Sequence, residues 1–115
     1  NNEESVTIWG TGNPIREWLY VEDGVKSLIK SIQLDEGNYF FNIGVNKGIS
    51  IKELATKIAE LLDWHGKFDY DLTRPDGAQE KRVEGSSSIE YLKWEPETNL
   101  EDGLIKTIEW YSNER

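Results

Sequence analysis

The chain as a whole is acidic, but two stretches of its sequence have more basic than acidic residues. In the first, Arg16 is the only charged residue from position 5 to position 16, and it follows Trp9 across a glycine-rich turn. Arg can grip a phosphate through two parallel hydrogen bonds, Lys adds a mobile point charge, and a Trp face can cover a base or sugar. The second stretch, from position 74 to position 82, holds more cations than acids: Arg74, Lys81 and Arg82 against Asp76 and Glu80. The two stretches therefore predict a site for a small phosphorylated ligand.

A purely structural explanation of the same residues stays open at this point. In it, Trp9 packs in the core, and the cations form surface ion pairs worth at most about 1 kcal/mol each. The sequence by itself does not decide between this alternative and ligand binding.

The other residue patterns indicate no catalytic, metal or cofactor site. The turn Gly10-Thr11-Gly12 lacks the third glycine of a dinucleotide fingerprint, because Ile15 stands at that position. Tyr20 lacks the lysine of a Tyr-x-x-x-Lys dyad, because Gly24 stands there. The single histidine, His65, has no second His or Cys nearby to complete a metal site. We therefore expect no catalytic residue, no metal ligand and no cofactor-binding residue in this chain.

Length, charge and composition narrow the class of protein. The chain has 115 residues, a net charge of −9, no Cys and no Met. This length predicts a single domain over residues 1–115, and the negative surplus argues against nucleic acid as a partner. No apolar run is long enough for a membrane span, and the start does not resemble a signal peptide. The lack of Cys fits a reducing compartment such as the cytoplasm. Because no Met occurs even at the first position, we expect a piece cut from a longer protein.

Strand and helix patterns alternate along the chain. Apolar residues recur at helical spacing from Val21 to Ile32, and Ser50 with Glu53 forms a capping box. The segment 39–44 is too apolar for a surface strand, so we expect it at the centre of a sheet. This alternation predicts an α/β fold in which helices cover a small, partly parallel sheet. The expected elements are strands at 5–9, 17–20, 39–44 and 67–70, helices at 21–32 and 51–62, a long loop at 72–88, a helical turn at 88–93 and a helix capped by Asn99.

Several ordered motifs resemble one known family. The segment from Trp9 to Asp23, Trp-Gly-Thr-Gly-Asn-Pro-Ile-Arg-Glu-Trp-Leu-Tyr-Val-Glu-Asp, is similar to a segment of the NAD-dependent epimerase/dehydratase family of extended short-chain dehydrogenases. Within that family, the Trp before the glycine turn and the Arg-Pro-Asp-Gly-x-x-x-Lys motif most resemble the GDP-L-fucose synthase branch. The later motifs follow in the order of the family: Asn42-Ile43-Gly44, Gly48 to Leu54, Arg74 to Gly77 with Lys81, Leu92-Lys93-Trp94 and a closing helix.

This resemblance implies a division of labour between two domains. In such enzymes an N-terminal Rossmann domain, absent from these 115 residues, holds NAD(P) and the catalytic Ser/Thr, Tyr and Lys. The C-terminal substrate domain closes over the nucleotide diphosphate of the sugar. By resemblance, Trp9 borders the substrate, Arg16 and Lys81 hold the diphosphate, and Arg74 and Asp76 shape the loop.

The sequence thus predicts the nucleotide-sugar-binding portion of an NAD(P)-dependent epimerase or reductase. The fragment alone is expected to be inert. Its expected partners are a nucleotide-diphosphate sugar and the missing Rossmann domain, with a homodimer possible in the parent enzyme. Two alternatives stay open: another member of the family, such as a UDP-glucose epimerase or a 4,6-dehydratase, and a non-catalytic acidic α/β interaction module.

Overall fold

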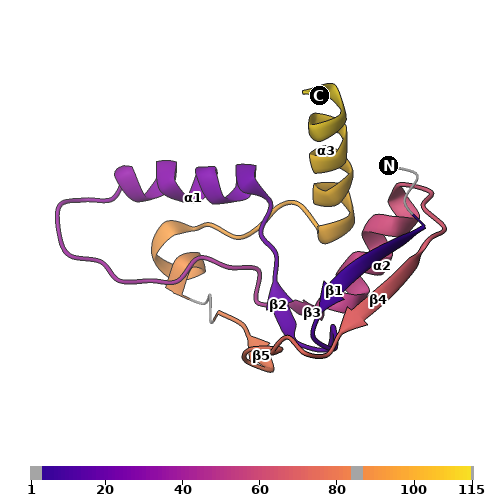
Figure 1. The fold of residues 1–115 in the computed structure, drawn as a ribbon. Coiled ribbons are helices and arrows are strands. Elements are labelled where there is room, and N and C mark those ends of the chain that lie inside the picture. The colour runs from indigo at the N-terminus through magenta and orange to yellow at the C-terminus, as the bar shows by residue number, and fades with distance from the viewer. Residues whose placement is uncertain (1–3, 84–86, 115) are drawn as a thin grey trace. The chain divides into compact units, whose positions relative to one another are not determined.

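The computed structural model describes residues 4–83 and 87–114, as an α/β arrangement of short strands and helices (Figure 1). Its contacts divide the chain into two compact units. The first unit comprises residues 1–16 and 49–81, and the second comprises residues 17–48 and 82–115. The predicted α/β class is confirmed, while the prediction of a single domain over residues 1–115 stays a prediction.

The first unit is built on a parallel pair of strands. β1 (Ser5–Trp9) pairs with β4 (Lys67–Asp71) in a register that runs from Ser5 beside Lys67 to Trp9 beside Asp71. β1 is followed by Gly10, which has a φ of +80°. Glycine adopts this positive φ at little cost because it has no Cβ. Both strands were expected from sequence, the second at 67–70, and both are confirmed.

A helix with a capping box precedes β4. In α2 (Ile51–Leu61), the Ser50 hydroxyl accepts the Glu53 N–H at 3.0 Å. The Glu53 carboxylate reaches back to the Ser50 hydroxyl at 3.3 Å, and not to its backbone N–H as a full capping box does. The backbone N–H of Lys52 donates to the Gly12 carbonyl at 2.9 Å, which ties the start of α2 to the glycine turn. The sequence pattern extends this helix to Leu62 and would bury that residue, whereas Leu62 follows the helix and is 54% exposed.

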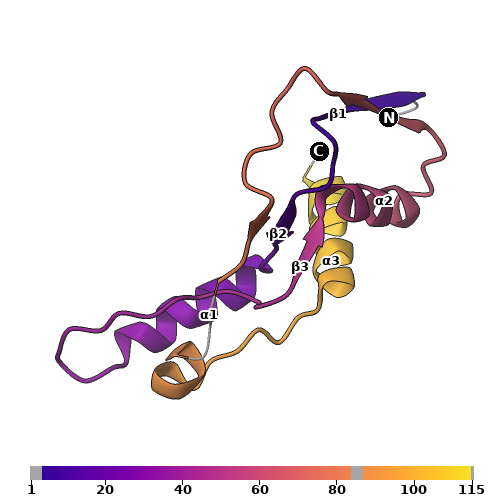
Figure 2. The same ribbon diagram turned by 90° about the horizontal axis from the view of Figure 1, so that it is seen from below.

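A second small sheet has the strand order β3-β2-β5, with β3 (Gly48–Ser50), β2 (Ile15–Glu17) and β5 (Glu80–Lys81). Figure 2 shows β2 and β3 running side by side. The expected strand at 17–20 lies earlier, at 15–17, because its pairing partner β5 meets Ile15 and Arg16. β3 has three residues and β5 has two, neither with an alternating pattern of its own, and the sequence analysis missed both. Residues 84–86 of the expected loop lie outside the described residues.

The second unit contains α1 (Val21–Ile32), η1 (Ser88–Leu92), which is one turn of π-helix, and α3 (Leu100–Asn113). All three were expected from sequence. Asn99 caps α3 as expected, because its side-chain oxygen accepts the Asp102 N–H at 2.8 Å. The buried apolar residues of this unit are Leu92 and Trp94.

Asp23 joins α1 to the segment before α3. It is 1% exposed, its Oδ2 accepts the Thr98 N–H at 3.0 Å, and its carbonyl accepts the Trp94 indole N–H at 2.9 Å. The sequence analysis assigned no such partner to Asp23. The buried contacts of α1 are therefore polar, at Asp23 and Ser27.

The expected central strand at 39–44 is absent from the structure. Tyr39 and Phe40 are exposed, Phe40 at 95%, and no described strand pairs with this segment. A strand needs a hydrogen-bonded neighbour, and none is available among residues 4–83 and 87–114. Within those same ranges, no helix is both long enough and apolar enough to cross a membrane.

Candidate functional site

The pairing of β2 with β5 brings together the two cations predicted to hold a diphosphate. Arg16 and Lys81 are partners in the parallel register of these strands. Neighbouring strands lie about 4.8 Å apart, and paired residues leave the sheet on the same face. The sequence separates these cations by a long loop, and the fold places them next to each other. Across residues 4–83 and 87–114, no carboxylate lies within ion-pair distance of either side chain.

Arg16 is held partly in place by its own strand and by the loop that leads to β5. Its Nη1 donates to the Ile15 carbonyl at 2.7 Å. A Cβ built on Gly77 would lie 3.6 Å from Arg16 Nη2, so the guanidinium passes close to this glycine, whose φ is +77°. Arg16 is half-buried and Lys81 is exposed. The pair therefore combines one oriented guanidinium with one mobile ammonium.

Asp76 fastens the loop after β4 to the glycine turn after β1. Its Oδ1 accepts the Thr11 backbone N–H at 2.7 Å, and its Oδ2 accepts the Thr11 hydroxyl at 2.8 Å. A Cβ built on Gly10 would lie 2.2 Å from Asp76 Oδ1. Gly10 thus gives the carboxylate the space it needs. This contact fits the loop-shaping role that the resemblance implies for Asp76.

Trp9 lies at the end of β1 with 66% of its surface exposed. The proposed alternative in which Trp9 packs in the core is therefore wrong. The Arg74 guanidinium carbon lies 4.6 Å from the centre of the Trp9 ring, a cation–π contact. Arg74 Nε also lies 3.6 Å from Asp71 Oδ2, so the surface ion pair of the structural alternative does occur at Arg74.

Hydrogen bonds favour the charged form of Asp71 and of Asp76. The Thr11 backbone N–H, followed by the Thr11 hydroxyl, lowers the pKa of Asp76 below its usual value of 3.8. The Thr73 hydroxyl and backbone N–H, with a smaller effect from Arg74, lower the pKa of Asp71 in the same way. Both groups are therefore anionic acceptors at neutral pH.

The glycine turn does not have the arrangement of a dinucleotide site. In such a site the turn leads into a helix whose free N–H groups meet a pyrophosphate. Here the turn leads into β2, and the N–H and hydroxyl of Thr11 already donate to Asp76. These residues do not fit NAD(P).

His65 makes a single local contact. Its Nε2 lies 2.9 Å from Asp63 Oδ1, and both side chains are exposed. In the described part of the chain, no group of three or more His, Cys, Asp or Glu residues could hold a metal ion.

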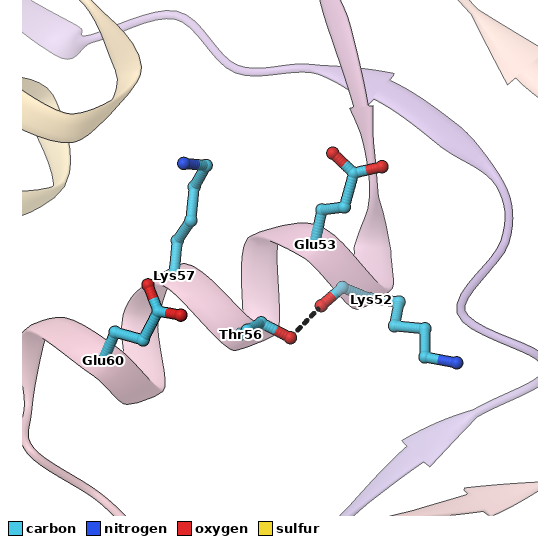
Figure 3. Close-up of a pocket in the computed structure, with 5 residues that line it drawn as sticks. All are labelled: Lys52, Glu53, Thr56, Lys57 and Glu60. Carbon is cyan, nitrogen blue, oxygen red and sulfur yellow. Dashed lines mark hydrogen bonds between the residues drawn. The ribbon is translucent and has the colours of Figure 1, made fainter.

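A shallow depression of about 310 Å³ runs along the exposed side of α2. Figure 3 shows that the charged ends of Lys52 and Lys57 point away from each other. The depression therefore offers no converging charge, and we do not count it as the ligand site. It is lined by Lys52, Glu53, Thr56, Lys57 and Glu60.

Sequence reasoning missed some residues that shape this site. Thr11 is the partner of Asp76, and its place between two glycines was the only signal. Tyr70 packs beside the same turn, because a Cβ on Gly12 would lie 2.9 Å from its ring, and Lys52 Nζ lies 5.4 Å from the Tyr70 ring centre. These contacts depend on β1 and β4 being neighbours, which sequence spacing does not reveal.

Comparison with known proteins identifies relatives of similar sequence. Residues 1–44 match the NAD dependent epimerase/dehydratase family. The chain is 38% identical over 111 residues to GDP-L-fucose synthase 1 of Arabidopsis thaliana, an alignment that covers 96% of this chain and 34% of the synthase. The epimerase/dehydratase resemblance expected from the motifs is thereby confirmed.

Solved structures of epimerase/dehydratase enzymes have the same fold as this chain. One is the UDP-glucose 4-epimerase of Thermotoga maritima with UDP-glucose, with a TM-score of 0.88 and 29% identity, covering 98% of this chain and 36% of the epimerase. Another is MoeE5 in complex with UDP-glucuronic acid and NAD, with a TM-score of 0.87 and 26% identity, covering 97% of this chain and 38% of MoeE5. The chain thus spans about a third of the length of its relatives.

Proposed function

We propose that this chain binds the nucleotide diphosphate of a nucleotide sugar, as part of an NAD(P)-dependent epimerase or reductase of the GDP-L-fucose synthase kind. The observation that carries the proposal is the pairing of Arg16 with Lys81 in the register of β2 and β5. Two neighbouring cations match the two charged groups of a diphosphate. Hydrogen bonds between charged partners are about twice as strong as neutral ones.

Trp9 supports the same proposal from the end of β1. An exposed indole that already stacks on a guanidinium offers a flat, polarizable face to a base or sugar. Arg74 holds the indole from one side, and Asp76 holds the turn that follows it. Under this proposal Trp9 borders the substrate, while Arg74 and Asp76 set the shape of the loop.

The chain's contribution to the reaction is positional and electrostatic. NAD(P), when bound elsewhere in the parent enzyme, supplies hydride transfer. Arg16 and Lys81 fix the diphosphate, and this orients the sugar for groups that lie outside these 115 residues. The fragment alone is accordingly proposed to be inert, and the parent to be an enzyme with a cofactor-binding Rossmann domain as its second part.

The proposal also covers the cellular compartment and the oligomeric state of the parent enzyme. The lack of Cys is consistent with a reducing compartment, so we place the parent in the cytoplasm. A homodimer of the parent is a further prediction, and the mass of the parent in solution checks it.

A second candidate is an enzyme that acts on a UDP-sugar. The observation in its favour is the likeness to the Thermotoga maritima epimerase, whose structure contains UDP-glucose. We favour the GDP-sugar because the Arabidopsis synthase is more similar in sequence, at 38% identity against 29%.

Direct titration separates these candidates. A suitable protein is a chimera in which this chain replaces the 111-residue stretch of Arabidopsis GDP-L-fucose synthase 1 with which it aligns. We expect calorimetry to record binding of GDP and weaker binding of UDP. Tighter binding of UDP would favour the second candidate. Binding of neither nucleotide by the folded chimera would leave only the non-catalytic interaction module.

A further inference from the structure

One face of the Trp9 indole is covered by a cation. The Arg74 guanidinium carbon lies 4.6 Å from the centre of the ring, and 66% of the Trp9 surface is still exposed. A cation above an aromatic face is attracted by the ring, but at an exposed site this attraction is weak. An Arg side chain also loses much rotamer freedom when it is held in one place. The stack therefore needs a second group that keeps the guanidinium in position.

Asp71 holds the backbone on both sides of this stack. It is the partner of Trp9 in the parallel register of β1 and β4. Its carbonyl accepts the Gly10 N–H at 2.9 Å and the Arg74 N–H at 3.2 Å. One carbonyl therefore fixes both the residue that follows Trp9 and the residue that carries the guanidinium.

The two carboxylate oxygens of Asp71 have different partners. Oδ1 accepts the Thr73 backbone N–H at 3.0 Å and the Thr73 hydroxyl at 2.5 Å. Bonds of this kind close a turn, here at the end of β4. Oδ2 instead lies 3.6 Å from Arg74 Nε. The first oxygen thus shapes the turn, and the second restrains the guanidinium.

Asp71 is the only described acid that pairs with Arg74. Over residues 4–83 and 87–114, no other carboxylate lies within ion-pair distance of this guanidinium. Asp76 follows Arg74 by two positions, but both of its oxygens accept hydrogen bonds from Thr11. An exposed ion pair adds little to the stability of a fold. The effect of the Asp71–Arg74 pair is therefore on where the guanidinium lies.

We propose that Asp71 is a positioning residue for the ligand site. It holds Arg74 on one face of the Trp9 indole, and this fixes the ring so that the opposite face meets the base or sugar of the ligand. Asp71 does not touch the ligand and acts through Arg74 and Trp9. The proposal rests on the proposed function, because it takes Trp9 to border a nucleotide sugar. It differs in assigning the orientation of the ring to one carboxylate oxygen.

Asp71→Asn separates the two tasks of the carboxylate. The amide oxygen still accepts the bonds from Thr73, whereas the amide nitrogen that replaces Oδ2 is a donor and does not attract a guanidinium. Asp69→Asn is the matched control, because it makes the same change in charge at an exposed acid two positions earlier in β4. Arg74→Gln removes the guanidinium and leaves Asp71 intact, so it should reproduce the effect of Asp71→Asn.

The first readout is the NMR spectrum of the 115-residue chain without nucleotide. Protons above an aromatic ring resonate upfield, so the side-chain signals of Arg74 report directly on its contact with Trp9. We expect Trp9→Ala to abolish this upfield shift and Asp71→Asn to remove most of it. Asp69→Asn should leave the Arg74 signals where they are.

The second readout is the affinity of the chimera for a nucleotide sugar. Calorimetry measures it with GDP-mannose, or with UDP-glucose if the chimera binds UDP more tightly than GDP. We expect Asp71→Asn and Arg74→Gln to weaken binding roughly 2- to 5-fold, the effect of losing an exposed cation–π contact. Trp9→Ala should weaken binding about 5-fold or more, the effect of losing a stacked aromatic ring. In the Trp9→Ala background, Asp71→Asn should have no further effect, because Asp71 acts through the ring.

Two results would overturn the proposal. One is an upfield shift of the Arg74 signals that persists in Asp71→Asn. The other is a double variant in which the losses from Trp9→Ala and Asp71→Asn multiply, as they would if Asp71 had a role in stability alone. An unsubstituted chimera that binds no nucleotide sugar, with the NMR shifts as expected, would instead remove the proposed function and leave the hold of Asp71 on Arg74 intact.

Discussion

Asp76 determines the local shape of the candidate site, because one carboxylate closes the glycine turn against the loop that leads to β5. It does so through two hydrogen bonds to Thr11. These bonds lower the pKa of Asp76 below 3.8, so the folded state favours the charged carboxylate. The contribution to stability is therefore present above the unfolded pKa and is lost as the pH falls through the lower folded pKa.

The first prediction concerns this pH dependence. The melting temperature of the chain should fall as the pH is lowered from about 5 to about 2, and Asp76→Asn should flatten that fall. Asp69→Asn, a change at an exposed acid of β4, serves as the control and should leave the slope as it is. Thermal melts at a series of pH values measure the effect. Equal slopes for Asp76→Asn and the unsubstituted chain would contradict it.

Gly10 provides the second prediction. Alanine at this position would have to adopt a φ of +80° and would place its Cβ 2.2 Å from Asp76 Oδ1. We expect Gly10→Ala to lower the free energy of unfolding by roughly 1–3 kcal/mol. The control is Gly37→Ala, because a Cβ there meets nothing closer than 3.5 Å. Urea denaturation of the two variants compares them. A similar stability for both would show that the turn tolerates a side chain.

The site residues could be predicted only in part from sequence. Residue type and the family motif led to the prediction of Arg16, Lys81 and Asp76 as site residues. They did not reveal Thr11, because its bond to Asp76 spans 65 positions and depends on the placement of β1 beside β4. They also left the exposure of Trp9 open, since a Trp after an alternating strand packs inward or outward with the same local pattern.

At the level of secondary structure, elements governed by local signals were predicted well. Ser50 and Asn99 cap the N-termini of α2 and α3 as expected, because a cap involves residues only three positions apart. The segment 39–44 was predicted wrongly as a central strand. A strand exists through its neighbour, and no described residue provides one. The exposure of the apolar residues of α1 was not predicted for a similar reason, because periodicity identifies an apolar stripe but not the surface against which it packs.

The third prediction concerns the attachment of α1 within the second unit. Asp23→Ala removes the buried acceptor of the Thr98 N–H, and we expect a loss of about 1–3 kcal/mol in the free energy of unfolding. Asp23→Asn keeps a side-chain oxygen and should cost less.

The control for Asp23 is Glu22→Ala. Glu22 is an exposed acid in the same first turn of α1, so its loss should change stability by less than about 0.5 kcal/mol. Denaturant titration of the three variants gives the ranking. A cost for Glu22→Ala equal to that of Asp23→Ala would assign the effect to the helix dipole and not to the buried bond.

At the level of the whole molecule, the acidic composition and the cationic site are compatible. The net charge of −9 is spread over exposed surfaces such as those of α1, α2 and α3, which carry Glu22, Glu53, Glu60, Glu101 and Glu109. Arg16 and Lys81 lie on other elements, the strands β2 and β5. The overall charge therefore argues against nucleic acid as a partner and still permits a small anion at one place.

The central claim is that Arg16 and Lys81 hold the diphosphate of a nucleotide sugar. Calorimetric titration of GDP into the chimera tests it most directly, with Arg16→Ala and Lys81→Ala beside Lys57→Ala, an exposed lysine of α2, as the matched control. Each of the first two changes should weaken binding by about 1.5–3 kcal/mol, roughly 10- to 150-fold in Kd, and Lys57→Ala should leave it unchanged. Unchanged affinity in both Arg16→Ala and Lys81→Ala, with both proteins folded, would contradict the account.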